Sequence, residues 1–566
     1  MLTRLLRAFA RLYPRQVDPG DDVDRALGFL EAEVTAATVV RAGCGAGLAC
    51  AAVAPVAVLV APPGFRMPAG LAVVAVAFAV THAVHAGPGL LATARRTSAL
   101  GEAPGVISRA VLRMRITPTV ETAATFAART GDGVLADSLG DHVRRARGTP
   151  GSGLSAFADE WGDRFPALRR GVLLIESAGS APPDERARAL DRAVEATLDG
   201  TRERMEAFAN EIRGPTTALY AFGVLLPLSL LSILPAAGAV GLTASVPVLV
   251  VVYDAVLPAG LVAAGAWLLA RRPVAFPPPT LSAEHPALDD SRVRAIAASL
   301  CVALIGWGVA TALLPGWTRV LAAVGPGIGT ALVVRYRRVM TVRDRIDDLE
   351  SGLADALYLV GRRIEEGLAV ESALDRATAE LTGETRAVFA AATRRQRQLR
   401  VGVDGAFRGE HGPLVELPSP RAESTVALLA LSAREGRPAG SAVVAMADHL
   451  EQLRTVEREA RRELESVTAT LGHTGAVFAP LVAGATVAMA DALSGGLLGS
   501  GGGPETAALG LAAGAYVLFL AVALTALAAG LSRGFDRALI GYRTGIALLI
   551  AVPTYLVAFA ATTRLV

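Results

Sequence analysis

Lysine is absent from this sequence, because all 55 basic residues are arginine. A Walker A loop needs a lysine that reaches the β- and γ-phosphates of a nucleotide, so the chain cannot contain one. Schiff-base chemistry and lysine nucleophiles are excluded in the same way. Neither a Gly-x-Ser-x-Gly elbow nor a His-Glu-x-x-His helix occurs. We therefore expect a protein that is not an enzyme and binds no cofactor.

Cysteine and aromatic residues are scarce. The three cysteines, Cys44, Cys50 and Cys301, lie in apolar runs and can build neither a disulfide framework nor a zinc knuckle. His82 and His85 are three residues apart in an apolar run that has no acidic partner. A metal site needs further ligands, so we expect packing or interfacial roles for the histidines and no metal. Aromatics make up only 5% of the chain, so its cores must consist of Ala, Val and Leu.

The chain also lacks a strong net charge and any long segment with a period of two. A charge of +3 over 566 residues argues against a nucleic-acid partner. With 52% hydrophobic residues and a mean hydropathy of +0.45, a wholly soluble protein is excluded. The missing alternation predicts no strands. We expect an all-α polytopic membrane protein.

Nine apolar runs are long enough to span a membrane, which takes about 20 residues. They lie at 42–61, 68–87, 216–236, 246–270, 295–314, 319–335, 473–492, 507–531 and 545–563. The sixth is the shortest and contains glycine and proline. The predicted domains are therefore a cytoplasmic segment 1–41, spans 42–88, a cytoplasmic module 89–215, spans 216–270, a linker 271–294, spans 295–335, a second module 336–472 and spans 473–566.

The arginines predict the orientation of these spans. If the N-terminus is cytoplasmic, every arginine except Arg66, Arg319 and Arg564 lies on the cytoplasmic side. This is the bias of multi-pass proteins toward positive charge inside. We expect a protein of the plasma membrane with its N-terminus inside and its C-terminus outside.

The two modules read as copies of one helical bundle, and the second begins with a helix predicted over 346–366. Each ends in a charged helix with a single apolar stripe, which continues directly into an apolar run that carries a proline, Pro227 or Pro480. The stripes are Leu190, Val194, Leu198, Met205, Phe208 and Ile212 in the first copy, and Leu450, Leu453, Val456, Ala460, Leu464, Val467 and Leu471 in the second. In the first copy Gly200, Gly214 and Pro215 weaken the helix. We therefore expect the helix of the second copy to be the lever, that is, the rigid rod that transmits a displacement of the module into the membrane.

This repeat resembles the F-domain family of inner-membrane platform proteins from type II secretion and type IV pilus systems. The phrases Gly-Leu-Ala-Val-Glu-Ser-Ala-Leu (367–374) and Leu-Ser-Ala-Arg-Glu-Gly-Arg-Pro (431–438) carry the likeness, which covers about 105–235 and 347–492. The extra spans look more like the archaeal pilus branch than the three-span bacterial form. A loop at 402–420 has no counterpart of similar length in the first module.

The resemblance implies a platform beneath a growing filament. It would dock a cytoplasmic hexameric secretion ATPase and help to extract pilin-like subunits from the membrane. Membrane lipid is a further expected partner, and a homo-oligomer is left open. The alternative is a secondary transporter that uses Asp254, a carboxylate within the fourth span. Asp254 could otherwise bond a neighbouring helix or contact a pilin. For Asp491, at the edge of the seventh span, a transport pathway, a bond to a neighbouring helix and a position at the outer interface stay open.

An arginine run is the remaining candidate contact site, formed by Arg394, Arg395, Arg397 and Arg400. Three interpretations stay open: a solvated helix face, contact with anionic lipid headgroups, and contact with an acidic surface of the ATPase. The glycine-rich stretch 495–503 resembles a phosphate loop but has no lysine, so we expect a flexible linker between spans.

Overall fold

A computed structural model gives the fold. It describes residues 2–60, 63, 66–131, 133–149, 151–239, 246–272, 291–435, 439–495, 506–534 and 536–565. All regular structure in these ranges is helical, which confirms the predicted all-α class. The glycine-rich stretch after Gly495, most of the linker 271–294 and residues 436–438 lie outside the described residues.

The first half of the chain contains two spans, a module and two further spans. The N-terminal helices are α1 (Leu2–Arg11), α2 (Asp21–Phe29), α3 (Ala36–Ala51), α4 (Ala54–Val60) and α5 (Arg66–Gly101). Module 1 consists of α6 (Ala103–Ile116), α7 (Val120–Thr130), α8 (Val134–Ala146), α9 (Leu154–Gly162), α10 (Pro166–Ser180) and the start of α11 (Pro183–Tyr220). The π-helical η2 (Ala221–Leu225), α12 (Leu226–Ala239), α13 (Val246–Val251), the π-helical η3 (Val252–Val256) and α14 (Leu257–Arg271) follow.

The second half repeats this order and adds one helix. Its first helices are α15 (Ser291–Leu313) and α16 (Thr318–Ser351). Module 2 consists of α17 (Leu353–Glu365), α18 (Val370–Glu380), α19 (Gly383–Leu399), α20 (Val403–Arg408), α21 (Pro413–Glu416), α22 (Pro420–Glu435) and the start of α23 (Ala439–His473). The π-helical η5 (Thr474–Phe478), α24 (Ala479–Gly495), α25 (Thr506–Arg533) and α26 (Arg537–Leu565) complete the chain.

Eight helices among the described residues are long and apolar enough to cross a membrane, and they coincide with eight of the nine predicted spans. The sixth predicted span, 319–335, forms the first half of α16 and is not among them, because glycines, Pro326 and Arg335 lower its hydropathy. It nevertheless packs along α15 and α26 through small residues. Ser299 Oγ donates to the Gly327 carbonyl (2.8 Å), and Gly329 lies against the Gly545 backbone.

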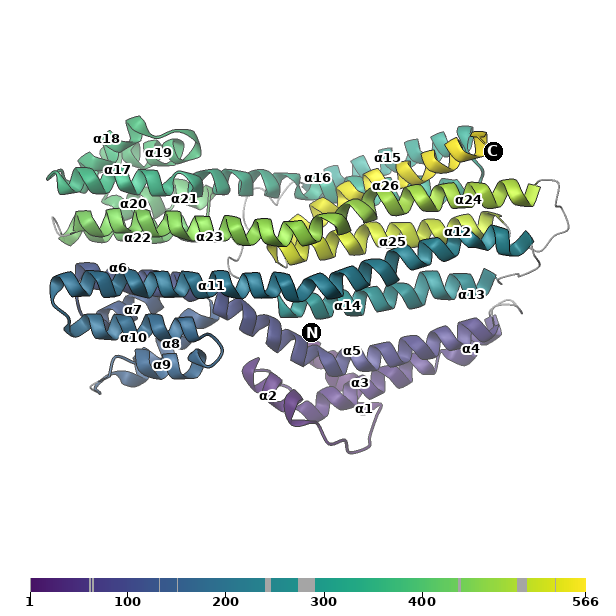
Figure 1. Ribbon diagram of the computed structural model, residues 1–566, viewed down its shortest axis with the longest axis horizontal. Coiled ribbons are helices and arrows are strands. Elements are labelled where there is room, and N and C mark those ends of the chain that lie inside the picture. The colour runs from purple at the N-terminus through teal and green to yellow at the C-terminus, as the bar shows by residue number, and fades with distance from the viewer. Residues whose placement is uncertain are drawn as a thin grey trace.

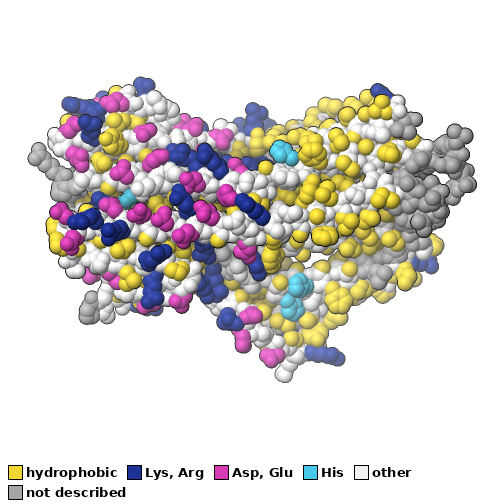
Figure 2. Space-filling model, viewed as in Figure 1, with side chains coloured by type: hydrophobic (Ala, Val, Ile, Leu, Met, Phe, Trp, Pro, Cys, Tyr) yellow, Lys and Arg dark blue, Asp and Glu magenta, His cyan; other side chains and the backbone are white. Residues whose placement is uncertain are grey.

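Both modules lie at the same end of the molecule, and the apolar helices form the other end (Figure 1). On the face shown in Figure 2, charged side chains gather over the module end, whereas the described part of the bundle carries many hydrophobic and few charged side chains. The C-terminus lies at the end of the bundle that is remote from the modules (Figure 1). This separation of charge from apolar surface fits a multi-pass membrane protein.

The two modules share a single hydrophobic core rather than folding as separate units. Buried residues of α6 to α11 and of α16 to α23 belong to one cluster. Across the boundary, the Arg109 guanidinium donates to Ser424 Oγ at 3.2 Å. Two connections differ from the sequence prediction. The helix expected over 346–366 breaks at Gly352, and the loop 402–420 contains α20 and α21, which stand between α19 and α22 as α9 stands between α8 and α10.

Buried aromatic packing explains the two short helices of module 2. The Phe407 ring of α20 meets the Phe389 ring of α19 edge to face, with centroids 5.2 Å apart, and both are fully buried. Val403 and Leu414 are buried beside them. The segment is therefore part of the core, which its glycines and prolines concealed in the sequence.

Candidate functional site

Two long helices, α11 and α23, carry the modules into the membrane bundle and pack against each other. Their predicted apolar stripes are buried as expected, with Val467 only partly so. Below the modules, the facing residues Met205, Phe208, Ile212, Ala460, Leu464 and Leu471 share one cluster. Ion pairs flank this seam: Arg202 with Glu459, and Arg213 Nη2 with Glu463 Oε1 at 2.7 Å. The pair thus runs continuously from the modules into the bundle.

Both helices continue unbroken to the membrane. α23 ends at His473 where η5 begins, and α11 passes through Gly200, Gly214 and Pro215 before η2. A Cβ at Gly200 would meet Ala167 Cβ at 2.2 Å, so this glycine lets α10 approach α11 closely. The helix of the first copy is thus continuous at these residues, and the difference in stiffness between the two copies stays a prediction.

The three π-helical segments share one feature of the local sequence. Each ends two residues before a proline: Pro227 after η2, Pro258 after η3 and Pro480 after η5. Proline has no backbone N–H, and its ring clashes with the carbonyl four residues earlier, which a local widening of the helix relieves. Pro215 and Pro326 lie inside α-helices that do not widen, so proline alone does not produce the segment. η2 and η5 occupy the same position in the two copies, at the point where each long helix enters its span.

Tyrosines join the widened segment of the first copy to the second copy. The Gly223 carbonyl, four residues before Pro227, accepts a hydrogen bond from the Tyr516 hydroxyl of α25. The Tyr253 hydroxyl of η3 donates to the Pro227 carbonyl at 2.5 Å. The two tyrosine rings pack edge to face with centroids 5.4 Å apart. These contacts hold the entry point of α11 within the bundle.

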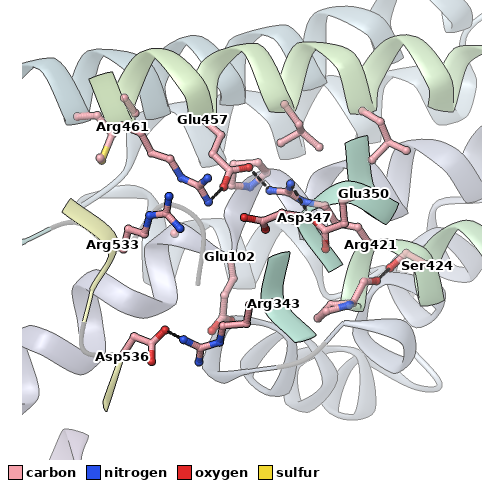
Figure 3. Close-up of a pocket in the computed structure, with 18 of the residues that line it drawn as sticks. Glu102, Arg343, Asp347, Glu350, Arg421, Ser424, Glu457, Arg461, Arg533 and Asp536 are labelled. Atoms are coloured by element: carbon pink, nitrogen blue, oxygen red, sulfur yellow. Dashed lines mark hydrogen bonds and ion pairs between the residues drawn. The ribbon is translucent and has the colours of Figure 1, made fainter. Parts of the chain in front are cut away.

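A cavity of about 260 Å³ lies where the modules meet the bundle (Figure 3). It is bounded by the start of α6, the second half of α16, the start of α22, the middle of α23 and the turn between α25 and α26. Six arginines and six acidic residues line it: Arg109, Arg272, Arg343, Arg421, Arg461, Arg533, Glu102, Asp344, Asp347, Glu350, Glu457 and Asp536.

A chain of ion pairs forms one side of this cavity. Arg421 of α22 contacts Glu350 of α16 at 3.0 Å and Glu457 of α23 at 2.6 Å, and Glu457 also accepts from Arg461 (Figure 3). Burial raises the pKa of Glu350, and Arg421 opposes that shift. Burial lowers the pKa of Arg421, but the two carboxylates outweigh burial and raise it. The cluster ties α23 to the rest of module 2 through charge.

A second ion pair lies on the membrane side of the cavity. Arg343 of α16 pairs with Asp536 in the turn before α26 (Figure 3). Asp536 Oδ1 also accepts from the backbone N–H groups of Ala538 (2.9 Å) and Leu539 (3.1 Å), and so caps α26. The last membrane helix is thereby anchored to the helix that enters module 2.

The arginine run predicted as a contact site lies elsewhere, on α19. Arg394, Arg397 and Arg400 are exposed, and Arg395 is half-buried. Arg397 pairs with Asp375 at 3.1 Å on the surface. α19 belongs to module 2, at the charged end of the molecule and outside the apolar bundle (Figure 1). This position favours a solvated face or a protein partner over lipid headgroups.

Asp254 lies in η3 within the fourth predicted span and is exposed, next to the buried Tyr253. The structure therefore does not bring it together with the arginine run. The sequence predicts packing or interfacial roles for His82 and His85. The His85 Nδ1 lies 2.7 Å from the Thr81 carbonyl oxygen of the preceding helical turn. Among the described residues, no group of three or more His, Cys, Asp or Glu side chains could hold a metal ion.

Sequence reasoning missed the cavity and the tyrosine contacts. The acidic and basic residues that meet at the cavity are up to hundreds of positions apart and look like ordinary charges of solvated helix faces. Tyr253 and Tyr516 carried a usable signal, since a phenol hydroxyl within an apolar span needs an acceptor. No protein-family model, curated protein or solved structure matches this chain.

Proposed function

We propose that this protein is the membrane platform of a type IV pilus or type II secretion-like assembly machine. In this role it couples a cytoplasmic secretion ATPase to the extraction of pilin-like subunits and to filament assembly. The action is mechanical, and the partner supplies the hydrolysis of ATP. The proposal rests on the sequence resemblance and gains support from the arrangement of the two modules.

The observation that carries the proposal is the parallel pair α11 and α23. Each helix begins in a module, belongs to the shared core, and enters the bundle through a π-helical segment. At 1.5 Å per residue, a helix as long as α23 extends over about 50 Å. A displacement of the modules therefore reaches the bilayer through rigid backbone rather than through a loop.

Interrupting α23 tests this idea. We expect a Gly-Pro insertion next to Arg461 to abolish filament assembly or secretion while the protein still inserts into the membrane, because proline breaks the hydrogen-bond ladder of a helix. The matched control is the same insertion after Gly148, in the exposed turn between α8 and α9. Normal filaments from the Arg461 insertion would refute the lever.

Co-purification tests the partner. We expect a hexameric ATPase and pilin-like subunits to be recovered with the protein from detergent extracts. If α19 binds an acidic ATPase surface, Arg394→Glu together with Arg397→Glu should abolish that recovery. Arg129→Glu together with Arg147→Glu, at two exposed arginines of module 1, serves as the charge-matched control. Unchanged recovery with the double variant would assign the α19 arginines to a solvated face.

The exposed position of Asp254 bears on the transporter alternative. A proton or substrate pathway calls for a carboxylate enclosed by helices, and Asp254 lies at the surface of the chain's own packing. We therefore propose Asp254 as a contact for a membrane-embedded partner such as a pilin. Asp254→Ala should reduce filament formation, and cells with normal filaments would exclude that contact.

A further inference from the structure

Arg272, at the end of α14, is buried at the membrane-facing side of the cavity and is only 6% exposed. Its Nε donates to the Leu531 carbonyl at 2.5 Å, and its Nη2 donates to the Ser532 carbonyl at 3.1 Å. Its Nη1 is buried and has no hydrogen-bond partner among the described residues. A guanidinium that is removed from water and lacks an opposite charge is unfavourable unless an anion compensates it.

The surroundings of Arg272 are positive rather than neutral. Burial lowers the pKa of Arg272 to about 10, and the nearby charge of Arg461 adds to that shift. Arg461 itself is paired with Glu457, which Arg421 also contacts. Among the described residues, the charge that acts on Arg272 is therefore that of another cation, and the carboxylate paired with that cation is shared by two arginines.

Arg533 adds a second uncompensated charge at this place. It lines the same cavity, and within the described part of the chain its guanidinium has no hydrogen-bond or ion-pair partner, although its Nε is buried. Figure 3 shows Arg461 and Arg533 directed toward the same space. The nearest carboxylate in sequence, Asp536, is paired with Arg343 and caps α26.

The remaining acids belong to the other wall of the cavity. Glu350 pairs with Arg421, and the charge of Asp347 acts on Arg343 and Arg421. Asp344 lies one turn from Asp347 on α16, and Glu102 accepts the Leu135 N–H at the module side. The cavity is thus neutral as a whole but polarised, with its free positive charge at the membrane side.

We propose that the membrane-facing end of this cavity binds a phosphate group, held by Arg272 Nη1 and Arg533 with Arg461 beside them. Guanidinium groups match phosphate oxygens in geometry and charge. The site lies where the predicted fourth span ends, which is the depth of a phospholipid headgroup. The phosphate can come from an anionic lipid or from a free phosphate in the cytoplasm, and this inference holds whether or not the protein assembles filaments.

The test uses the full-length protein purified in detergent and stripped of lipid. Its thermal unfolding is followed in two titrations, one with inorganic phosphate and one with micelles doped with phosphatidylglycerol. Micelles doped with phosphatidylcholine control for the general effect of lipid. Stabilisation by phosphate identifies a free anion, and stabilisation by phosphatidylglycerol alone identifies a headgroup. If neither phosphate nor phosphatidylglycerol stabilises the protein, the proposal is overturned.

Variants locate the binding. Arg533→Gln should weaken the apparent affinity at least about tenfold, the effect of losing one charged hydrogen bond, and Arg533→Lys should recover part of it. Arg271→Gln is the matched control, since Arg271 stacks on the Trp267 ring (4.1 Å) outside the cavity. Arg272→Gln should act like Arg533→Gln, but it also removes two backbone contacts, so Arg533 decides. Equal binding by the wild type and Arg533→Gln would overturn the proposal.

Discussion

Arg421→Met should destabilise the paired modules more than the loss of any surface arginine. Arg421 bridges Glu350 and Glu457, whose side chains are only 12% and 9% exposed. Methionine keeps much of the apolar stem but leaves both carboxylates near each other, with only Arg461 as compensation for Glu457. Removing one partner of a buried pair costs about 3–5 kcal/mol. For a cooperative unit of this size, that corresponds to a fall in Tm of roughly 10 °C.

The assay is thermal unfolding in detergent, followed by tryptophan fluorescence. Trp161 is buried in the shared core and reports on its integrity. The control is Arg458→Met on the same helix as Glu457, because Arg458 pairs with Glu451 at 3.0 Å with both side chains more than half exposed. Such a pair contributes at most about 1 kcal/mol.

A compensating variant separates lost charge from lost packing. If the cost comes from uncompensated carboxylates, Glu350→Gln combined with Arg421→Met should recover part of the stability, since one of the two buried charges is then neutral. Equal Tm values for Arg421→Met and Arg458→Met would refute the reasoning, and so would a double variant less stable than Arg421→Met alone.

Two further predictions concern packing. Tyr516→Phe should lower stability by about 1–3 kcal/mol in the same thermal assay, because the Gly223 carbonyl loses its donor. The control is Tyr358→Phe, at an exposed tyrosine of module 2, which should leave the Tm unchanged. Equal effects of the two variants on the Tm would contradict the contact between Tyr516 and Gly223. Gly361→Ala should destabilise module 2, since its Cβ would lie 2.9 Å from the Val444 backbone nitrogen. The control is Gly472→Ala, whose Cβ meets no atom within 4 Å and which should raise the Tm slightly. The reverse order of Tm values would exclude close packing at Gly361.

The helices and their stripes could be predicted because their signals are local. An amphipathic period such as that from Leu450 to Leu471 already says which face is buried, and a run of 20 apolar residues says where the chain crosses the bilayer. The same local view failed at 402–420, where Phe407 is buried by a contact with Phe389 that no periodicity reveals. The local view also predicted one helix over 346–366, where the structure has a break between α16 and α17 at Gly352. The sequence did not reveal this break because it depends on the tight packing of Thr385, from α19, against Gly352.

The cavity could not be predicted for a different reason. Arg272, Arg461 and Arg533 come from three helices separated by long stretches of sequence, and each looks like a common charge at a helix end. Only the packing of the two copies against each other brings them together. The sixth predicted span, 319–335, shows a different limit of sequence analysis. Its hydropathy is too low to identify it as a span, and its place in the bundle follows from contacts such as that of Gly329 with the Gly545 backbone.

If the two halves are copies of one unit, the single core shared by both modules makes the chain the equivalent of a dimer in one polypeptide. Two identical subunits related by a two-fold axis must present a self-complementary face, so every substitution there appears twice. Covalent fusion removes that requirement, and the boundary shows the result: Arg109 of one copy meets Ser424 of the other, without a mirrored pair being required. A residue at this boundary can therefore change in one half of the chain without a matching change in the other half.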